Sequence, residues 1–404
     1  MKLTRPDVLR TRAEKHNWLA DIPELLVTLE HPVYQYGNII LPKRQIVKSA
    51  NVFCKKLEVA LYRVYNDNIV RTFKEQENEM RVFDLHTDTM MDIANKVGKG
   101  EKDILAKYHL QHYKEGEIGG QIFAMWVPKK YEDAADYFLE SDATSQELMM
   151  RMLARCFKEF RDYDTVKIAY NAEDIERIYE SGQIPVLLGF EGFYGFDGEL
   201  GMIDVMYDLG FRHGMLTWND DNEFASGVEF TDEDKGLSPL GVETIKRMES
   251  LGMLIDVSHA SQKTFWDIMD VTTGPIIASH SNAWALCNAP RNLRDEQIRA
   301  IAERGGVIGM NGWKGFICED METATVHDLA RHARYIADLV GPEYVACGFD
   351  FSNYFDPTEG TPGIENAGKS QNFVQALFDV GFSEKEVQAI AWDNALRVIK
   401  EVLG

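Results

Sequence analysis

Six residues of the types that bind metal ions lie at or directly after the ends of short apolar segments. They are His86 and Asp88 in RVFDLHTD, Glu191 after IPVLLGF, His259 in MLIDVSH, His280 in PIIASH and Asp350 in YVACGFD. Imidazole nitrogens and carboxylate oxygens are ligands of zinc and related divalent ions. If these segments are strands that end on one side of a domain, residues far apart in the sequence meet at a single site.

The spacing of His86 and Asp88 favours a shared ion. In a strand of period two, both side chains lie on the same face, so one imidazole and one carboxylate can bind together. The alternative for an isolated pair of this kind is a packed histidine followed by an aspartate that caps a helix. Glu191 has the same ambiguity, because a carboxylate at the edge of a core requires either a metal or an ion pair.

Three histidines and two carboxylates together can hold two metal ions. His259 and His280, taken singly, are equally well explained as packing residues that form hydrogen bonds. Two ions roughly 3.5–4 Å apart can share a hydroxide and bind a substrate at both ends, with a carboxylate as the bridge. That arrangement hydrolyses amides or esters.

The elements that must position these residues are eight short apolar runs. Candidate strands are Arg81 to Asp88, Gln121 to Val127, Ile184 to Phe190, Arg212 to Trp218, Met253 to His259, Pro275 to His280, Gly306 to Asn311 and Tyr344 to Asp350. Segments with helical periodicity separate them. Eight strands buried on both faces predict an α/β fold, a (β/α)₈ barrel of the TIM type, whose active site lies at the carboxyl-terminal strand ends.

Helix boundaries are visible in two places. Ser238, Pro239 and Gly252 predict an N-cap, a first-turn proline and a C-cap. Ser383 and Glu386 predict a capping box that opens a helix continuing to the C-terminus. The string KIAY at Lys167 fits either a minor strand or a loop and is not counted among the eight strands.

The composition excludes several classes of protein. The chain has 404 residues, 45% of them apolar, and a net charge of −22, which disfavours binding to nucleic acids or anionic membranes. Five scattered cysteines without a CxxC pair predict a reducing compartment. No signal-peptide-like or membrane-spanning apolar segment and no nucleotide-binding glycine motif is present, so we expect a cytoplasmic protein without a nucleotide cofactor.

The chain divides by composition near Met80. Residues 1–80 carry a net charge of +3, whereas the rest carries −25. We expect residues 1–80 to form a mostly helical extension packed on the barrel, with an amphipathic helix over Val52 to Phe73, and residues 81–404 to form the barrel. A partner-binding or oligomerisation arm is the alternative for the extension.

Several motifs, in order along residues 81–403, resemble the membrane (renal) dipeptidase family of metallopeptidases. They are DLHTDT at 84–89, GGQIFAMWVP at 119–128, FEG at 190–192, GLSPLG at 236–241, LGMLIDVSHAS at 251–261, IASHSNA at 277–283, PRN at 290–292 and GFDF at 348–351. The resemblance implies a binuclear zinc barrel, and it makes a homodimer plausible. Residues 1–80 lie outside the usual bacterial-type domain of the family.

The resemblance also implies roles for individual residues. It makes His86 and Asp88 ligands of one zinc, His259 and His280 ligands of the other, and Glu191 the bridging carboxylate. Asp350 matches the family's catalytic acid, which moves a proton from the attacking hydroxide to the leaving amine. Arg291 matches the arginine that contacts the substrate.

Three departures from the family pattern bear on specificity. Leu216-Thr217-Trp218 replaces a pattern that ends in a substrate-contacting histidine, so Trp218 is a candidate substrate-binding residue whose indole N–H donates instead. The second acid of the DFDG motif is absent from Asp350-Phe351-Ser352-Asn353. Gly192-Phe193-Tyr194 stands where two glycines are frequent.

The predicted function is therefore a zinc-dependent dipeptidase that hydrolyses short peptides with a free C-terminal carboxylate through a metal-bridging hydroxide. An amidohydrolase acting on N-acyl amino acids or other small amides is the alternative, because fold and ligands do not fix the substrate. A non-enzymatic metal-bound scaffold is a third hypothesis. The preferred stereochemistry and the metal in the cell, zinc or another divalent ion such as manganese or cobalt, do not follow from the sequence.

Overall fold

The computed structural model describes residues 35–36, 39–40, 79–128, 143–351, 353 and 360–404. The chain divides into two compact units, Met1–Glu77 and Asn78–Gly404. In the first unit, the described residues form two short antiparallel strands, β1 (Gln35–Tyr36) and β2 (Ile39–Ile40). The predicted helix at Val52 to Phe73 and the predicted packing of residues 1–80 on the barrel lie outside the described residues.

The second unit is a nearly closed parallel barrel, as predicted. Its strands are β3 (Val82–Thr87), β4 (Ile118–Trp126), β6 (Ile184–Glu191), β7 (Phe211–Met215), β8 (Leu254–Ile255), β9 (Ile277–Ala278), β10 (Val307–Met310) and β11 (Val345–Cys347). They are ordered β8-β7-β6-β4-β3-β11-β10-β9. A single parallel bridge between Asp256 and Ile277 joins the two ends of this order. The ambiguous string at Lys167 contains a minor strand, β5 (Val166–Ile168), which pairs with β6.

The strands are apolar on both faces, which explains why their sequences are continuous apolar runs. Neighbouring residues in one strand belong to two different buried clusters: Leu187 to the smaller and Leu188 to the larger, and likewise Ile277 and Ala278. Trp392, from the C-terminal region, completes the smaller cluster. Since side chains alternate across a strand, the two clusters lie on opposite faces of the barrel wall.

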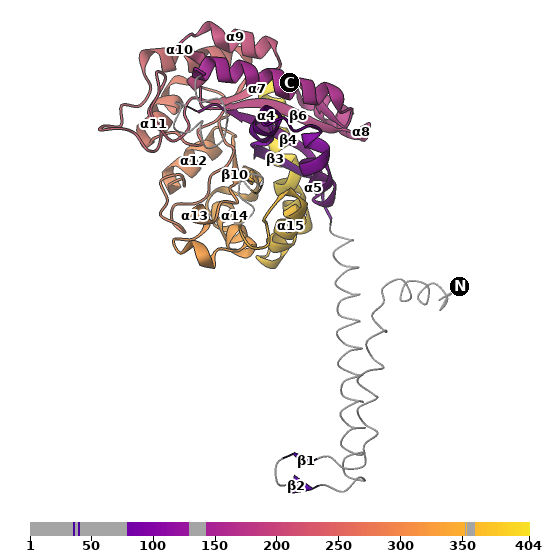
Figure 1. The fold of residues 1–404 in the computed structure, drawn as a ribbon. Helices are drawn as coiled ribbons and strands as arrows, with labels where there is room; N and C mark the ends of the chain where they lie inside the picture. The colour runs from indigo at the N-terminus through magenta and orange to yellow at the C-terminus, as the bar shows by residue number, and fades with distance from the viewer. Residues whose placement is uncertain (1–34, 37–38, 41–78, 129–142, 352, 354–359) are drawn as a thin grey trace. The chain divides into compact units, whose positions relative to one another are not determined.

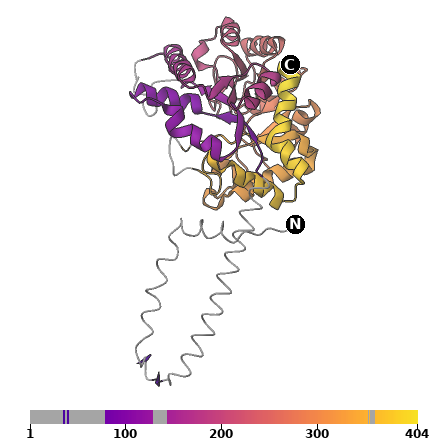
Figure 2. The same ribbon diagram turned by 90° about the vertical axis from the view of Figure 1, so that its right-hand side faces the viewer.

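Helices surround the strands in both views (Figures 1 and 2). They are α4 (Thr89–Gly98), α5 (Leu110–Glu115), α7 (Ser145–Asp162), α8 (Ala172–Glu180), α9 (Gly201–Asp208), α10 (Pro239–Leu251), α11 (Gln262–Val271), α12 (Asp295–Glu303), α13 (Lys314–Ile317), α14 (Val326–Val340), α15 (Ser370–Asp379), α16 (Glu384–Gln388) and α17 (Asn394–Leu403). Two π-helical segments, η1 (Leu105–His109) and η6 (Ala389–Asp393), precede α5 and α17. Within the described ranges, no helix combines the length and apolarity that a bilayer crossing requires.

The predicted helix boundaries are confirmed. Ser238 Oγ accepts a hydrogen bond from the backbone N–H of Gly241, and Gly252 ends α10 in the left-handed conformation with a φ of 68°. Ser383 and Glu386 form the capping box of α16. The predicted C-terminal helix is however interrupted, because η6 separates α16 from α17.

Candidate metal centre

The barrel brings the six predicted residues together at the carboxyl-terminal ends of its strands. His86 lies in β3, Asp88 directly precedes α4, Glu191 ends β6, and His259, His280 and Asp350 follow β8, β9 and β11. Asp88 occupies the N-cap position of α4, yet its side chain makes no capping hydrogen bond. The helix-cap alternative for this aspartate therefore does not hold, and its carboxylate is available to the site.

Glu191 lies at the centre of the group. Its Oε1 is 2.9 Å from Nε2 of His259 and 3.7 Å from Nε2 of His280. Its Oε2 is 3.5 Å from Nε2 of His86. A carboxylate that faces three imidazoles through both of its oxygens has a geometry suited to a bridging ligand.

His86 belongs to two overlapping sets of donor atoms. Its Nε2 is 3.9 Å from an oxygen of Asp88 and 3.9 Å from an oxygen of Asp350. The donor atoms of these three residues lie within 4.8 Å of one another, and so do those of His86, Glu191 and His280. Asp350, which the sequence predicts as the acid rather than as a ligand, thus lies beside the predicted ligand pair.

Around His86, the arrangement fits a divalent cation better than it fits hydrogen bonds. His86 Nε2 and Asp88 Oδ1 are buried and have no hydrogen-bond partner among the described residues, which is rare for buried polar atoms. Separations of 3.5–3.9 Å are too long for hydrogen bonds. Ligand atoms around a tetrahedral ion with bonds of about 2.0–2.2 Å lie roughly 3.4 Å apart, close to what is observed.

The electrostatics of the site also favour added positive charge. Burial lowers the pKa of His86, but the carboxylates of Glu191, Asp350 and Asp88 outweigh that effect and raise this pKa to about 10. Burial, and then the repulsion from Glu191 and Asp350, raises the pKa of Asp88 well above its usual range. Three carboxylates in one buried space repel one another, and bound cations would remove that repulsion.

Two of the six residues have a strained backbone. His259 has a φ of 66° and Asp350 a φ of 56°, a left-handed conformation that costs a non-glycine residue roughly 1–3 kcal/mol. Hydrogen bonds hold both segments, because the N–H of Val228 donates to the carbonyl of His259 and the N–H of Asp350 donates to the carbonyl of His86. Such strain concentrates at functional sites.

Side chains that the sequence reasoning missed orient the histidines. Asn219 Oδ1 lies 2.7 Å from Nδ1 of His259, and Ser279 Oγ lies 2.7 Å from Nδ1 of His280. These contacts leave the Nε2 atoms of both rings facing Glu191. Partners on the second ring nitrogen fix the tautomer of a metal-binding histidine. No spacing signal reveals them, since Asn219 and His259 are 40 residues apart.

A buried contact between a histidine and an aspartate supports the loops that carry these histidines. Nε2 of His213 is 2.8 Å from Oδ2 of Asp256, and neither side chain is exposed. The other oxygen of Asp256 accepts hydrogen bonds from the N–H groups of Ser258 and Ser279. Asp256 thereby links the residues that directly precede His259 and His280.

The two predicted substrate-contacting residues lie next to the site. Arg291 is buried, and its Nη2 donates to the carbonyl oxygen of His280 over 3.3 Å. Its Nε has no hydrogen-bond partner among the described residues. The ring of Trp218 is 6.1 Å from that of His259 and 5.2 Å from that of Trp126.

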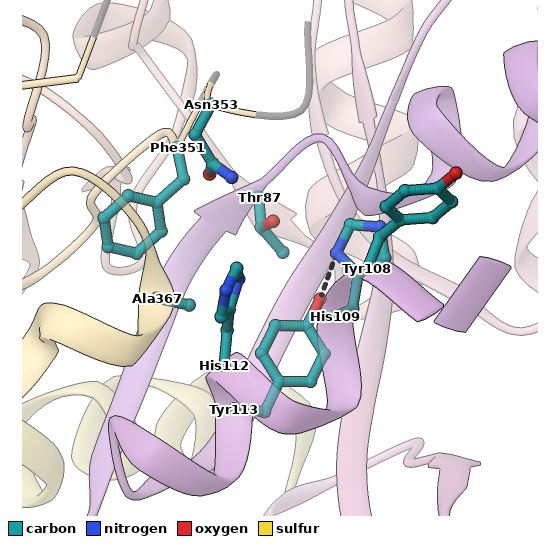
Figure 3. A pocket seen from close by; sticks show the side chains of 8 residues that line it. All are labelled: Thr87, Tyr108, His109, His112, Tyr113, Phe351, Asn353 and Ala367. Carbon is teal, nitrogen blue, oxygen red and sulfur yellow. Dashed lines mark hydrogen bonds between the residues drawn. The ribbon is translucent and has the colours of Figure 1, made fainter. Parts of the chain in front are cut away.

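A small pocket adjoins the end of β3 (Figure 3). A network of hydrogen bonds lies beside it. Asp92 contacts Nε2 of His109 at 2.8 Å. The hydroxyl of Thr89 contacts that of Tyr113 at 2.6 Å and that of Thr87 at 3.0 Å. Tyr113 Oη also lies 3.4 Å from Nδ1 of His109, as the dashed line in Figure 3 shows. This network fixes the end of β3, where two of the candidate ligands lie.

Comparisons with known proteins identify relatives over most of the chain. The family model for the membrane dipeptidases (peptidase family M19) matches residues 70–403. An uncharacterized Klebsiella pneumoniae protein is 36% identical over 250 residues, which cover 59% of this chain and 89% of that protein. A Schizosaccharomyces pombe protein named as an uncharacterized dipeptidase is 30% identical over 347 residues, which cover 81% of this chain and 82% of that protein.

A solved structure shares the fold. It is a metallopeptidase of Rhodobacter sphaeroides bound to a phosphinate mimic of the dipeptide L-Ala-D-Ala. The match has a TM-score of 0.71 and 22% identity, and covers 80% of this chain and 99% of the other.

Proposed function

This chain belongs to the membrane dipeptidase family, peptidase family M19, and we propose that it hydrolyses short peptides with a free C-terminal carboxylate, using two zinc ions. As a member of that family it is a metallo-dipeptidase. The observation that supports the proposal most directly is the convergence of six candidate ligand side chains on one place, where His86 Nε2 and Asp88 Oδ1 have no hydrogen-bond partner among the described residues.

We assign the ions to the predicted ligands. His86 and Asp88 would hold one ion, His259 and His280 the other, and Glu191 would bridge them. Imidazole-rich sets favour zinc, although other divalent metals bind the same ligands. When bound, the ions supply Lewis acidity toward the peptide carbonyl and make water a better nucleophile near neutral pH.

We assign proton transfer to Asp350. Burial, together with the charge of Glu191, raises the pKa of its carboxyl group despite the opposing effect of His86, and a pKa nearer to the working pH suits a general acid and base. Asn311 donates a hydrogen bond over 3.1 Å to Oδ2 of Asp350. In the proposed reaction, Asp350 accepts a proton from the attacking water and delivers it to the leaving amine.

We assign recognition of the peptide's carboxylate to Arg291. Its guanidinium is a planar, bidentate donor, and one N–H group is already fixed by the carbonyl of His280. Burial lowers the pKa of Arg291 to about 10, so the group is still charged at neutral pH. Trp218, close to His259, is the residue that we expect to modify substrate choice.

A panel of L-L and L-D dipeptides, with amine release measured on zinc-loaded protein, tests the proposal. We expect hydrolysis that stops when a chelator removes the metal and returns when zinc is restored. N-acylated amino acids in the same assay test the alternative amidohydrolase function. Hydrolysis of the acylated substrates alone, with two metal ions bound, would exclude the dipeptidase assignment.

A cytoplasmic location and a homodimer are also proposals. The described cysteines, Cys156, Cys287, Cys318 and Cys347, are free thiols, as a reducing compartment predicts. Light scattering after size exclusion would give the mass of the particle, and a mass of one chain would exclude the dimer.

A further inference from the structure

A second pocket lies at the same end of the barrel as the metal centre but contains none of its predicted ligands. It has a cavity volume of about 250 Å³, just below the roughly 300–1,000 Å³ of typical ligand pockets, so it suits a small ligand. The loops after β7, β8 and β9 form it. Its lining residues are Val228, Phe230, Ala260, Ser261, Gln262, Trp284, Asn288, Pro290 and Arg294.

The pocket has an apolar and aromatic wall, polar side chains beside it, and one positive charge. Val228, Phe230 and Trp284 supply apolar and aromatic surface, and Phe230 is 41% exposed although it is a large apolar residue. The guanidinium of Arg294 lies 4.4 Å from the centre of the Trp284 ring. An arginine on an aromatic face keeps its N–H groups free at the edge for a planar acceptor.

Arg294 has no acidic partner among the residues that the structure describes. Two carboxylates near the pocket, those of Asp295 and Asp234, have other partners. Asp295 accepts hydrogen bonds from the hydroxyl of Tyr335 at 2.9 and 3.1 Å. Asp234 accepts hydrogen bonds from the hydroxyl of Ser261 and the N–H of Lys263.

Within the described part of the chain, Arg294 contacts no carboxylate, although the chain has a net charge of −22. Arg177, Arg331 and Arg334 each pair with an aspartate, and Arg304 and Arg397 donate to backbone carbonyl oxygens. For Arg294, the described contact is instead the ring of Trp284. The Arg294 guanidinium thus retains its full capacity for a carboxylate, and the apolar wall beside it provides surface for the rest of such a molecule.

We propose that this pocket binds a small carboxylate that carries an apolar or aromatic group. Arg294 holds the carboxylate, and Trp284, Val228 and Phe230 enclose the apolar part. The site does not depend on the metal centre, although Ala260 directly follows His259 and Pro290 directly precedes Arg291.

Calorimetric titration of the full chain with 3-phenylpropanoate, after a chelator has removed the metals, tests this inference. We expect saturable binding at one site, and at least tenfold weaker binding of the uncharged analogue 3-phenylpropanamide. Arg294→Gln should weaken the binding of 3-phenylpropanoate tenfold or more, whereas Arg294→Lys should retain part of it. Arg331→Gln, which removes an exposed arginine paired with Asp328, is the control and should bind normally.

Arg291→Gln separates this pocket from the proposed substrate site. The inference requires normal binding in Arg291→Gln and weak binding in Arg294→Gln. The reverse pattern would place the carboxylate at the metal centre and overturn the inference, as would equal binding of the amide or no binding at all. A change of particle mass in Arg294→Gln would instead make the pocket an interface between copies, which also overturns it. Because no hydrolysis is measured, failure here is distinct from failure of the dipeptidase assignment.

Discussion

The buried pair of Asp256 and His213 gives the sharpest test of how the barrel supports its site. Asp256→Ala removes the partner of His213 and also the acceptor of two backbone N–H groups, those of Ser258 and Ser279. Each buried donor left without its acceptor costs roughly 1–3 kcal/mol, so the loss of one acceptor that serves His213, Ser258 and Ser279 costs at least about 3 kcal/mol. We expect a loss of that size in the free energy of unfolding.

Urea unfolding of the metal-free protein measures this loss. Asp204→Ala is the matched control, since Asp204 pairs with Arg247 at the surface, where both side chains are more than 40% exposed, and surface pairs contribute little. We expect the unfolding midpoint to move far in Asp256→Ala and hardly at all in Asp204→Ala. Equal shifts of the two midpoints would refute the argument that the burial of the carboxylate sets the cost of removing it.

The same pair predicts a pH dependence. Contacts with His213, Ser279 and Ser258 outweigh burial and lower the pKa of Asp256 from 3.8 to about 2. A carboxyl group with a lowered pKa in the folded state stabilises the fold above pH 4 and loses that contribution as the pH falls toward 2. A shift of this size corresponds to a contribution on the order of 2 kcal/mol. If the stability of Asp256→Ala fell as steeply with acid as that of the unaltered chain, other groups would cause the loss.

Three further substitutions test the metal centre. Glu191→Gln should lower bound metal toward one ion per chain or none, because the proposed bridge is lost, and unchanged two-metal content by elemental analysis would remove Glu191 from that role. Asp350→Asn should retain its metal but lose roughly 10²–10⁴-fold in kcat, and turnover within a few fold of the unaltered enzyme would make Asp350 structural. Trp218→His should change the relative kcat/KM values across a dipeptide panel without changing metal content, and an identical profile would place Trp218 outside the substrate pocket.

The strands and the meeting of the six residues could be predicted from the sequence because two simple regularities hold. Strands that are covered on both faces read as continuous apolar runs, and Leu187 beside Leu188 illustrates this directly. In a parallel barrel, all strands end on the same side. Strand ends such as those before Glu191 and His280 therefore converge, however long the segment between them.

The finer geometry could not be predicted, because it depends on contacts between distant segments. Asp88 lies beyond β3, so the alternation of side chains along a strand does not explain why Asp88 meets His86. The pairing register between β3 and β4 also shifts between Asp84 and Thr87. The contact between Asn219 and His259 arises from two loops. The left-handed backbone of His259 is held by Val228 from another loop, and local sequence preferences oppose it.

Exceptions to local rules are themselves evidence for the site. Ser238 and Ser383 occupy N-cap positions and accept hydrogen bonds from backbone N–H groups of their helices, which is the ordinary use of a short polar side chain there. Asp88 occupies the same position at α4 but makes no such bond, and its Oδ1 is buried with no hydrogen-bond partner in the described part of the chain. An N-cap hydrogen bond stabilises a helix by roughly 0.5–2 kcal/mol. Because the Asp88 carboxylate does not make this bond, we infer that a stronger partner holds it. Asp88 faces His86 and the other carboxylates of the site, and a divalent cation is the partner that its surroundings suit.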